Sequence, residues 1–510
     1  MRKIPVITLI FATLFVASCS KAPELANSIP DEAFLVASFH PKQLHDKGQL
    51  ATFESITEKI DNEILLGILK DPSLSGVNLD AYAYMFVYFP DENDDDPSIG
   101  FTAALRDEGK FSAMIKDLMK DEELKISTSG DYSMIIPEND DAAMAWNQKQ
   151  VIFLTSPDHN NSAEASQEKL MGLFELARED AVTSIVDFKD FNGKMKDMNV
   201  WFTGDELKRI MEKSPSMKGM DFDLPVELYN NYAQVFMDFD DGAMYLHSET
   251  HLSDDISKAA ETFMVAKENL NEDLLEITPG NNLLMAMAFS LDLEKASNMV
   301  KNFSPPQMDS VSGRIEQVTG IAGKEILEAL NGDFVMAVNG APEGSAIPIE
   351  VLIGIGLDDE TLQDKLLGTA GNWADVQQDG EFFTINASGM ELYSGIVNGV
   401  WVLTNATGYK EAVSGAGLEK TLNDSKFKDY ADGSMGMYLN LDLTTYPANL
   451  QALMASGGAP EMLETLTESF LSMGVEASNK SSDMTLITAD ENENSLYTIL
   501  KVMEMAQKAK

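Results

Sequence analysis

Short apolar runs alternate along the chain with stretches in which apolar residues recur at helical spacing. Residues 34–39 form one apolar run, entered through Pro30 and followed by the start of a helix, which is typical of a strand that leads into a helix. A later helical stripe consists of Phe111, Met114, Ile115, Leu118 and Met119. Because the strands are joined by hairpins as well as helices, we expect an α+β fold with mixed or mostly antiparallel sheets packed with helices.

The same succession of elements occurs twice along the chain. Pro30 precedes the first strand of one copy and Pro279 that of the other, 249 positions later. The segment FKDF at residues 188–191 recurs as FKDY at residues 427–430. Seven features recur in the same order at offsets of 239 to 252 residues. This repetition predicts that the fold consists of two homologous halves that arose by internal duplication.

The predicted halves span residues 29–275 and 276–510. Each half is expected to contain one two-stranded hairpin, at residues 132–136 and 144–155 in the first half and at residues 382–385 and 392–404 in the second. The final helix carries the apolar residues Leu496, Ile499, Leu500 and Met503 on one side. We expect this helix to close the second half.

Residues 1–19 have the features of a secretion signal. Arg2 and Lys3 precede an apolar run at residues 4–17, which is shorter than the ~20 residues that a membrane-spanning helix needs. The run ends in VASC, which resembles the bacterial lipobox, and Cys19 is the only cysteine of the chain. We therefore predict that Cys19 is lipidated and anchors the protein to a membrane. Residues 20–28 would form a short tether.

The residues after the cysteine suggest a destination. The resemblance to lipoproteins implies that Ser20 favours the outer membrane over retention in the inner membrane. Lys21 interrupts the acidic stretch that directs some lipoproteins to the cell surface. The chain is therefore expected to be lipid-anchored in the outer membrane, facing either the periplasm or the cell surface.

The charge of the chain excludes some classes of partner. The net charge is −46, from 37 Lys and Arg against 83 Asp and Glu. Nucleic-acid binding requires basic side chains that neutralise phosphates, so this balance argues against a nucleic-acid partner. It also disfavours broad contact with anionic lipid headgroups, which leaves the lipid anchor as the expected link to the membrane.

One short segment contains possible metal ligands. In YLHSETH, at residues 245–251, His247, Glu249 and His251 would share one face of an extended strand, and this set of side chains suits zinc. We expect the strand to end near Ser248, however, which would break the alignment. The sequence shows no fourth ligand, so a solvated strand end is the preferred interpretation and a metal site the weaker one.

Other chemical motifs are missing from the sequence. The segment GIAGK at residues 320–324 is too short for a P-loop and is followed by Glu325. There is no G-x-S-x-G nucleophile elbow. We interpret the 29 methionines as flexible core packing rather than as copper ligands. We therefore predict no cofactor and assign no catalytic residue.

The lipobox, the Ile29-Pro30 strand entry and the repeated FKD segment together resemble an uncharacterised lipoprotein family of Bacteroidota-type bacteria, defined by a domain of unknown function. The resemblance implies a place in the cell envelope and no known activity. We expect a binding or scaffold protein with an envelope protein or glycan as partner. The alternative is a hydrolase of envelope glycans or peptides, with acidic residues in a cleft between the halves. The sequence leaves the ligand and the oligomeric state open.

Overall fold

The computed structural model describes residues 22–508, apart from residues 61, 90–96, 121–124, 137–141, 156–162, 205–230, 254–264, 298–312, 314–315, 318, 346, 372–373, 388 and 457–459. The predicted signal peptide and Cys19 lie outside the described residues. No helix within the described part of the chain has the length and apolar character needed to cross a bilayer.

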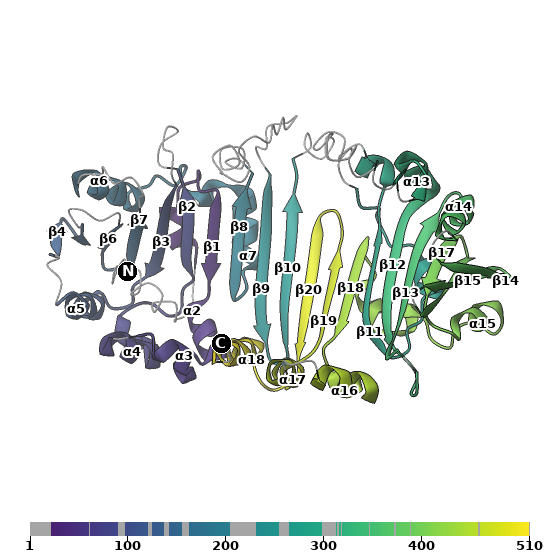
Figure 1. Cartoon of the computed structure of the whole chain (residues 1–510). Helices are drawn as coiled ribbons and strands as arrows, with labels where there is room; N and C mark the ends of the chain where they lie inside the picture. Colours follow the sequence, from purple (N-terminus) through teal and green to yellow (C-terminus); the bar gives the residue numbers. More distant parts are fainter. Residues whose placement is uncertain are drawn as a thin grey trace. The chain divides into compact units, whose positions relative to one another are not determined.

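The chain forms two compact units (Figure 1). The described residues up to Ser253 and those from Asp490 onward belong to unit 1, and the described residues between them, up to Ala489, belong to unit 2. This division lies about twenty residues before the predicted boundary at 275. The final helix, α18 (Ser495–Lys508), belongs to unit 1, whereas the sequence predicted that it closes the second half.

Unit 1 contains one antiparallel sheet. Its strands follow one another in the order β4 (Ser127–Ser129), β5 (Tyr132–Ile135), β6 (Ala142–Trp146), β7 (Gln150–Thr155), β3 (Ser98–Ala104), β2 (Ala83–Tyr88), β1 (Leu35–Phe39), β8 (Met198–Thr203), β9 (Tyr232–Asp240) and β10 (Ala243–His251). Every pairing among these strands is antiparallel.

Unit 2 repeats this order of strands. Its sheet runs β14 (Asp375–Asp379), β15 (Phe382–Ala387), β16 (Met390–Val397), β17 (Val400–Thr404), β13 (Ile349–Leu357), β12 (Leu330–Gly340), β11 (Leu283–Ser290), β18 (Met435–Asn440), β19 (Phe470–Ala477) and β20 (Ser481–Thr488). These pairings are also antiparallel, so the predicted α+β class with mostly antiparallel sheets is confirmed.

The predicted hairpin strands were too long in both units. The expected strand 144–155 consists of β6 and β7, which are separated by a turn in which the Asn147 side chain accepts hydrogen bonds from two backbone N–H groups. The expected strand 392–404 consists of β16 and β17 with a turn at Asn398-Gly399. Both turn residues have positive φ, the conformation that Asn-Gly pairs favour in two-residue hairpins.

Helices pack on both sides of the sheet in unit 1, since Phe153 of β7 shares one core with Phe111 and the adjacent Ile152, on the opposite face, shares another with Phe188. The helices are α2 (Pro41–Gly48), α3 (Glu54–Thr57), α4 (Glu63–Lys70), α5 (Glu108–Leu118), α6 (Ala163–Phe174), α7 (Val186–Lys194) and α18. The predicted stripe of α5 is confirmed, since Phe111 and Ile115 are fully buried. In α7, the phenylalanines of the FKDF segment pack against Trp201 in the core.

The expected tether folds as part of unit 1. Residues 22–28 form a 3₁₀ helix in which Leu25 and Ala26 are buried in the same core as α7. The Gln150 side chain donates a hydrogen bond to Ser28 at 2.8 Å. The chain therefore packs on the domain from Leu25 onward, before the predicted start of the first half at residue 29.

The helices of unit 2 are α10 (Glu272–Glu276), α13 (Gly323–Ala329), α14 (Thr361–Ala370), α15 (Tyr409–Ser414), α16 (Ala448–Ser456) and α17 (Pro460–Ser469). A 3₁₀ helix at Lys426–Tyr430 contains the second FKD segment. Its Phe427 is fully buried in the main core of this unit, as Phe188 is in unit 1.

Candidate functional site

The predicted metal ligands lie on one face of β10. The strand does not end near Ser248 but continues to His251, because β9 pairs with it along its whole length, as far as Tyr232 opposite His251. The alternation of side chains therefore places His247, Glu249 and His251 on the same face.

These three side chains are engaged in other interactions. Glu249 accepts a hydrogen bond from His247 at 2.9 Å and pairs with Lys194 at 3.1 Å. The hydrogen bond from His247 and the nearby Lys194 lower the pKa of Glu249. The ring of His251 stacks on Tyr232, with centroids 4.7 Å apart. Among the described residues, no group of three or more His, Cys, Asp or Glu is arranged to hold a metal ion.

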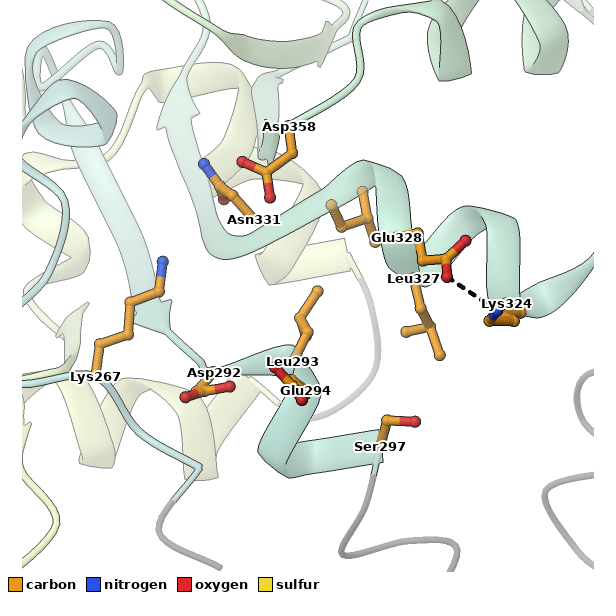
Figure 2. A pocket seen from close by; sticks show the side chains of 11 residues that line it. Lys267, Asp292, Leu293, Glu294, Ser297, Lys324, Leu327, Glu328, Asn331 and Asp358 are labelled. Atoms are coloured by element: carbon orange, nitrogen blue, oxygen red, sulfur yellow. Dashed lines mark ion pairs between the residues drawn. The ribbon is translucent and has the colours of Figure 1, made fainter. Parts of the chain in front are cut away.

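Unit 2 contains a polar pocket of about 620 Å³ (Figure 2). It lies where β11, β12 and β13 meet the loops and helices that follow or precede them. Gly332, with φ of 89°, allows β12 to pass close to Leu291, whose backbone N–H donates to the Gly332 carbonyl at 2.9 Å. The pocket is lined by Lys267, Asp292, Leu293, Glu294, Ser297, Lys324, Leu327, Glu328, Leu330, Asn331 and Asp358.

The cations of this pocket are already paired. Lys267 forms an ion pair of 2.8 Å with the buried carboxylate of Asp333. Figure 2 shows the second pair, between Lys324 and Glu328, at 3.1 Å. Glu294 and Asp358 have no such partner among the described residues. The pocket therefore has a net negative character that suits a polar, cationic group rather than an anion.

A second feature of unit 2 is an apolar side of the sheet. Along β11 the larger side chains Met285, Met287 and Phe289 are half-buried, whereas Ala286 and Ala288 between them are fully buried in the core. The same alternation occurs in β12, where Val335 and Ala337 belong to the core. The strands thus direct small residues toward the main core and large ones to the other side, where a smaller core with Leu362 of α14 covers Trp401 of β17, the strand next to β13.

We call this other side the methionine face. The pairing of the strands places its residues in three rows, with Ile353, Met336, Met287, Met437, Val475 and Met484 in the middle row, Val351, Val338, Met285, Leu439, Met473 and Leu486 in a second, and Ile355, Phe334, Phe289 and Met435 in a third. Seven of these sixteen residues are methionines, and none is charged. All are half-buried except Met435, which is 36 % exposed.

The methionine face corrects one interpretation of the sequence. Some methionines do fill the core, such as Met114, Met134 and Met144 in unit 1. The seven methionines of the face do not. The alternation of Met with Ala at positions 285–288 was a signal that could have revealed them. The polar pocket left no comparable signal, because its residues come from segments that are distant in the sequence.

The sequence profile of a family described as "Domain of unknown function (DUF4836)" matches residues 25–496, which is most of the chain. The chain belongs to this family. The predicted resemblance to a family defined by a domain of unknown function is thereby confirmed. The family description assigns no activity, ligand or catalytic residue.

Comparisons with other proteins add little. No curated protein matches the chain. Among solved structures, the chain is similar to crystal form I of TP0453, with a TM-score of 0.28 and 7 % identity over 49 % of this chain and 89 % of that one. Crystal form III of the same protein gives a TM-score of 0.29 and 6 % identity over 49 % and 90 %. Neither likeness is strong enough to support an argument about fold or function.

Proposed function

We propose that this member of the DUF4836 family is a lipid-anchored protein of the bacterial envelope that binds another envelope molecule and does not catalyse a reaction. The observation that carries the proposal is the methionine face. Six neighbouring strands spaced by ~4.8 Å and three rows spaced by ~6.8 Å give an apolar area of roughly 400 Å². Patches of this size on soluble proteins commonly mark interaction sites.

The composition of the face supports binding rather than core formation. A methionine side chain has three rotatable bonds and a polarizable sulfur, so it adapts to apolar partners of irregular shape. Phe289 and Phe334 stack with centroids 4.7 Å apart and add a rigid aromatic surface beside the methionines. Flexible methionines next to rigid rings are suited to contact with another macromolecule.

The anchor is the second part of the proposal. Cys19 would carry the lipid and hold the protein in the outer membrane, facing the periplasm or the cell surface. Because Leu25 and Ala26 are buried in the core of unit 1, no more than five residues would separate Cys19 from the first buried residue, a reach of at most ~20 Å. The folded protein would therefore lie close to the membrane surface.

We also infer that the two units descend from one duplicated α+β half. Ten strands follow one another in the same order in both sheets, from β4 to β10 in unit 1 and from β14 to β20 in unit 2. The phenylalanine of each FKD segment is fully buried in the main core of its unit. This agreement of topology and packing supports duplication more directly than the sequence offsets do.

Two measurements in intact cells test the proposal. Metabolic labelling with a fatty-acid analogue should label the wild-type protein, and Cys19→Ala should abolish both the label and recovery in the membrane fraction. Mild cross-linking followed by purification should recover an envelope partner in stoichiometric amount. An unlabelled protein would contradict the anchor, and a monomer that yields no cross-linked partner would contradict the binding function.

A further inference from the structure

We propose that the methionine face receives the apolar side of a basic amphipathic helix from a partner protein. This inference rests on the proposed binding function and specifies the chemistry of the partner. Three properties of unit 2 lead to it: the shape of the face, its lack of charge, and the charge of the residues around it.

The shape of the face matches a single helix. Six strands span ~24 Å from β13 to β20, and the three rows span ~14 Å along the strands. An α-helix with its side chains is ~10–12 Å wide, and sixteen residues of helix cover ~24 Å. One helix of four to five turns that crosses the strands would therefore cover most of the face.

The face itself recognises only apolar side chains. Its middle row contains Met336, Met287 and Met437 in succession, each half-buried and each opposite the next across a strand pair. A helix with leucines or other large apolar residues at i, i+3, i+4 and i+7 presents a matching stripe. The polar side of that helix would point away from the sheet.

The charge of unit 2 determines which charged side chains the polar side of the docked helix would carry. Residues 254–489 contain 35 Asp and Glu and only 12 Lys and Arg, a net charge of −23. This field attracts Lys and Arg on the flanks of a docked helix. It repels a second copy of this chain, which has the same sign of charge, and it repels an anionic lipid surface. Of the three apolar partners considered, charge favours the basic helix.

The inference can be tested with defined peptides and the full chain carrying Cys19→Ala, which removes the anchor. The probes are three fluorescent 18-residue peptides, namely an amphipathic Leu/Lys helix, an amphipathic Leu/Glu helix, and a scrambled Leu/Lys peptide of identical composition. Binding is followed by fluorescence anisotropy at low and at physiological salt. We expect the Leu/Lys helix to bind at least about tenfold more tightly than either of the other two.

Variants then locate the binding site. Met435 is the most exposed residue of the face, so Met435→Lys should fold normally and weaken Leu/Lys binding by about tenfold through like-charge repulsion. Met435→Glu should weaken it much less. The matched control is Leu74→Lys, since Leu74 is an exposed leucine of unit 1 and this change should leave binding unaltered. Met437→Lys provides a second position within the middle row.

Several results would overturn the inference. Equal binding of the helical and scrambled Leu/Lys peptides would show attraction by charge alone, and equal effects of Met435→Lys and Leu74→Lys would place binding elsewhere. Binding to phosphatidylglycerol vesicles that depends on Met435, or dimerisation that Met435→Lys abolishes, would identify a membrane or a second copy as the occupant. If cells yield a cross-linked envelope partner while the peptides show no preference, this inference fails and the proposed binding function stands.

Discussion

Met287 of β11 lies directly opposite Met437 of β18, and both side chains are half-buried on the side of the sheet that faces away from the main core of unit 2. On the other side of the same strands, Ala286 and Ala288 are fully buried. Large flexible residues thus occupy the outer side and small ones the inner side, the reverse of what an ordinary core-facing strand requires. This arrangement is the structural basis for assigning a binding role to unit 2.

Oxidation should distinguish the two classes of methionine. The half-buried Met287 and Met437 and the more exposed Met435 should form sulfoxides in dilute hydrogen peroxide well before Met114 and Met144, which are buried in the core of unit 1. Peptide mass spectrometry measures the rate at each position. Equal rates for face and core methionines would contradict the assignment of the face.

The buried ion pair of unit 1 should contribute far more to stability than a surface pair. Asp197 is fully buried, lies 2.6 Å from Lys47, and accepts the backbone N–H of Phe239 at 2.8 Å. Asp197→Ala would leave both donors without this partner, and we expect a loss of about 3 kcal/mol in the free energy of unfolding. The control is Asp46→Ala, which breaks the exposed pair with Lys42 and should cost about 0.5 kcal/mol or less. Urea denaturation of both variants checks the difference.

The stabilising contribution of Glu249 in β10 depends on pH. The hydrogen bond from His247 and the charge of Lys194 lower this pKa below the ordinary value of 4.5. The stabilising contribution of the ionised form is therefore complete above pH 4.5 and is lost as the pH falls through the folded-state pKa. Glu249→Gln should reduce the loss of stability in that acid range.

Nuclear magnetic resonance titration tests the cause of this shift. His247→Ala should raise the pKa of Glu249 more than Lys194→Ala does, because the hydrogen bond from His247 is the larger effect. A larger rise in Lys194→Ala would contradict the assignment. Addition of zinc should leave the titration unchanged, since Glu249 and His251 are engaged in other contacts.

The C-terminal helix should stabilise unit 1 specifically. In α18, Tyr497 packs against Phe53 with ring centroids 5.3 Å apart, and Glu504 accepts the backbone N–H of Ser55 at 2.8 Å. Deletion of residues 495–508 should therefore accelerate amide hydrogen exchange in α2 and α3. The strands β12 and β13 of unit 2 provide the internal control and should exchange at the wild-type rate. Equal acceleration in both units would contradict the assignment of α18 to unit 1.

The local pattern of apolar and polar residues predicted most of the helices and strands. It could not predict contacts between segments that are distant in the sequence. The helical stripe of Phe111 and Ile115 and the apolar strand before His40 both appear in the structure. The Asn398-Gly399 pair is a local signal for a hairpin turn, and we overlooked it in the sequence. The length of β10 depends on its pairing with β9, and the place of α18 depends on packing with α2 and α3, neither of which is encoded near those segments. The predicted hydrolase alternative and the lipid anchor stay predictions.

The most direct test of the account is site-specific photo-cross-linking in intact cells. A photoreactive amino acid is placed at Met437, at the centre of the methionine face, and in a control strain at Leu74, which is exposed but lies outside the face. The account predicts a discrete adduct with one envelope protein from position 437 and none from position 74. The absence of an adduct at position 437, or the same adducts from both positions, would contradict the claim that this face is a binding surface.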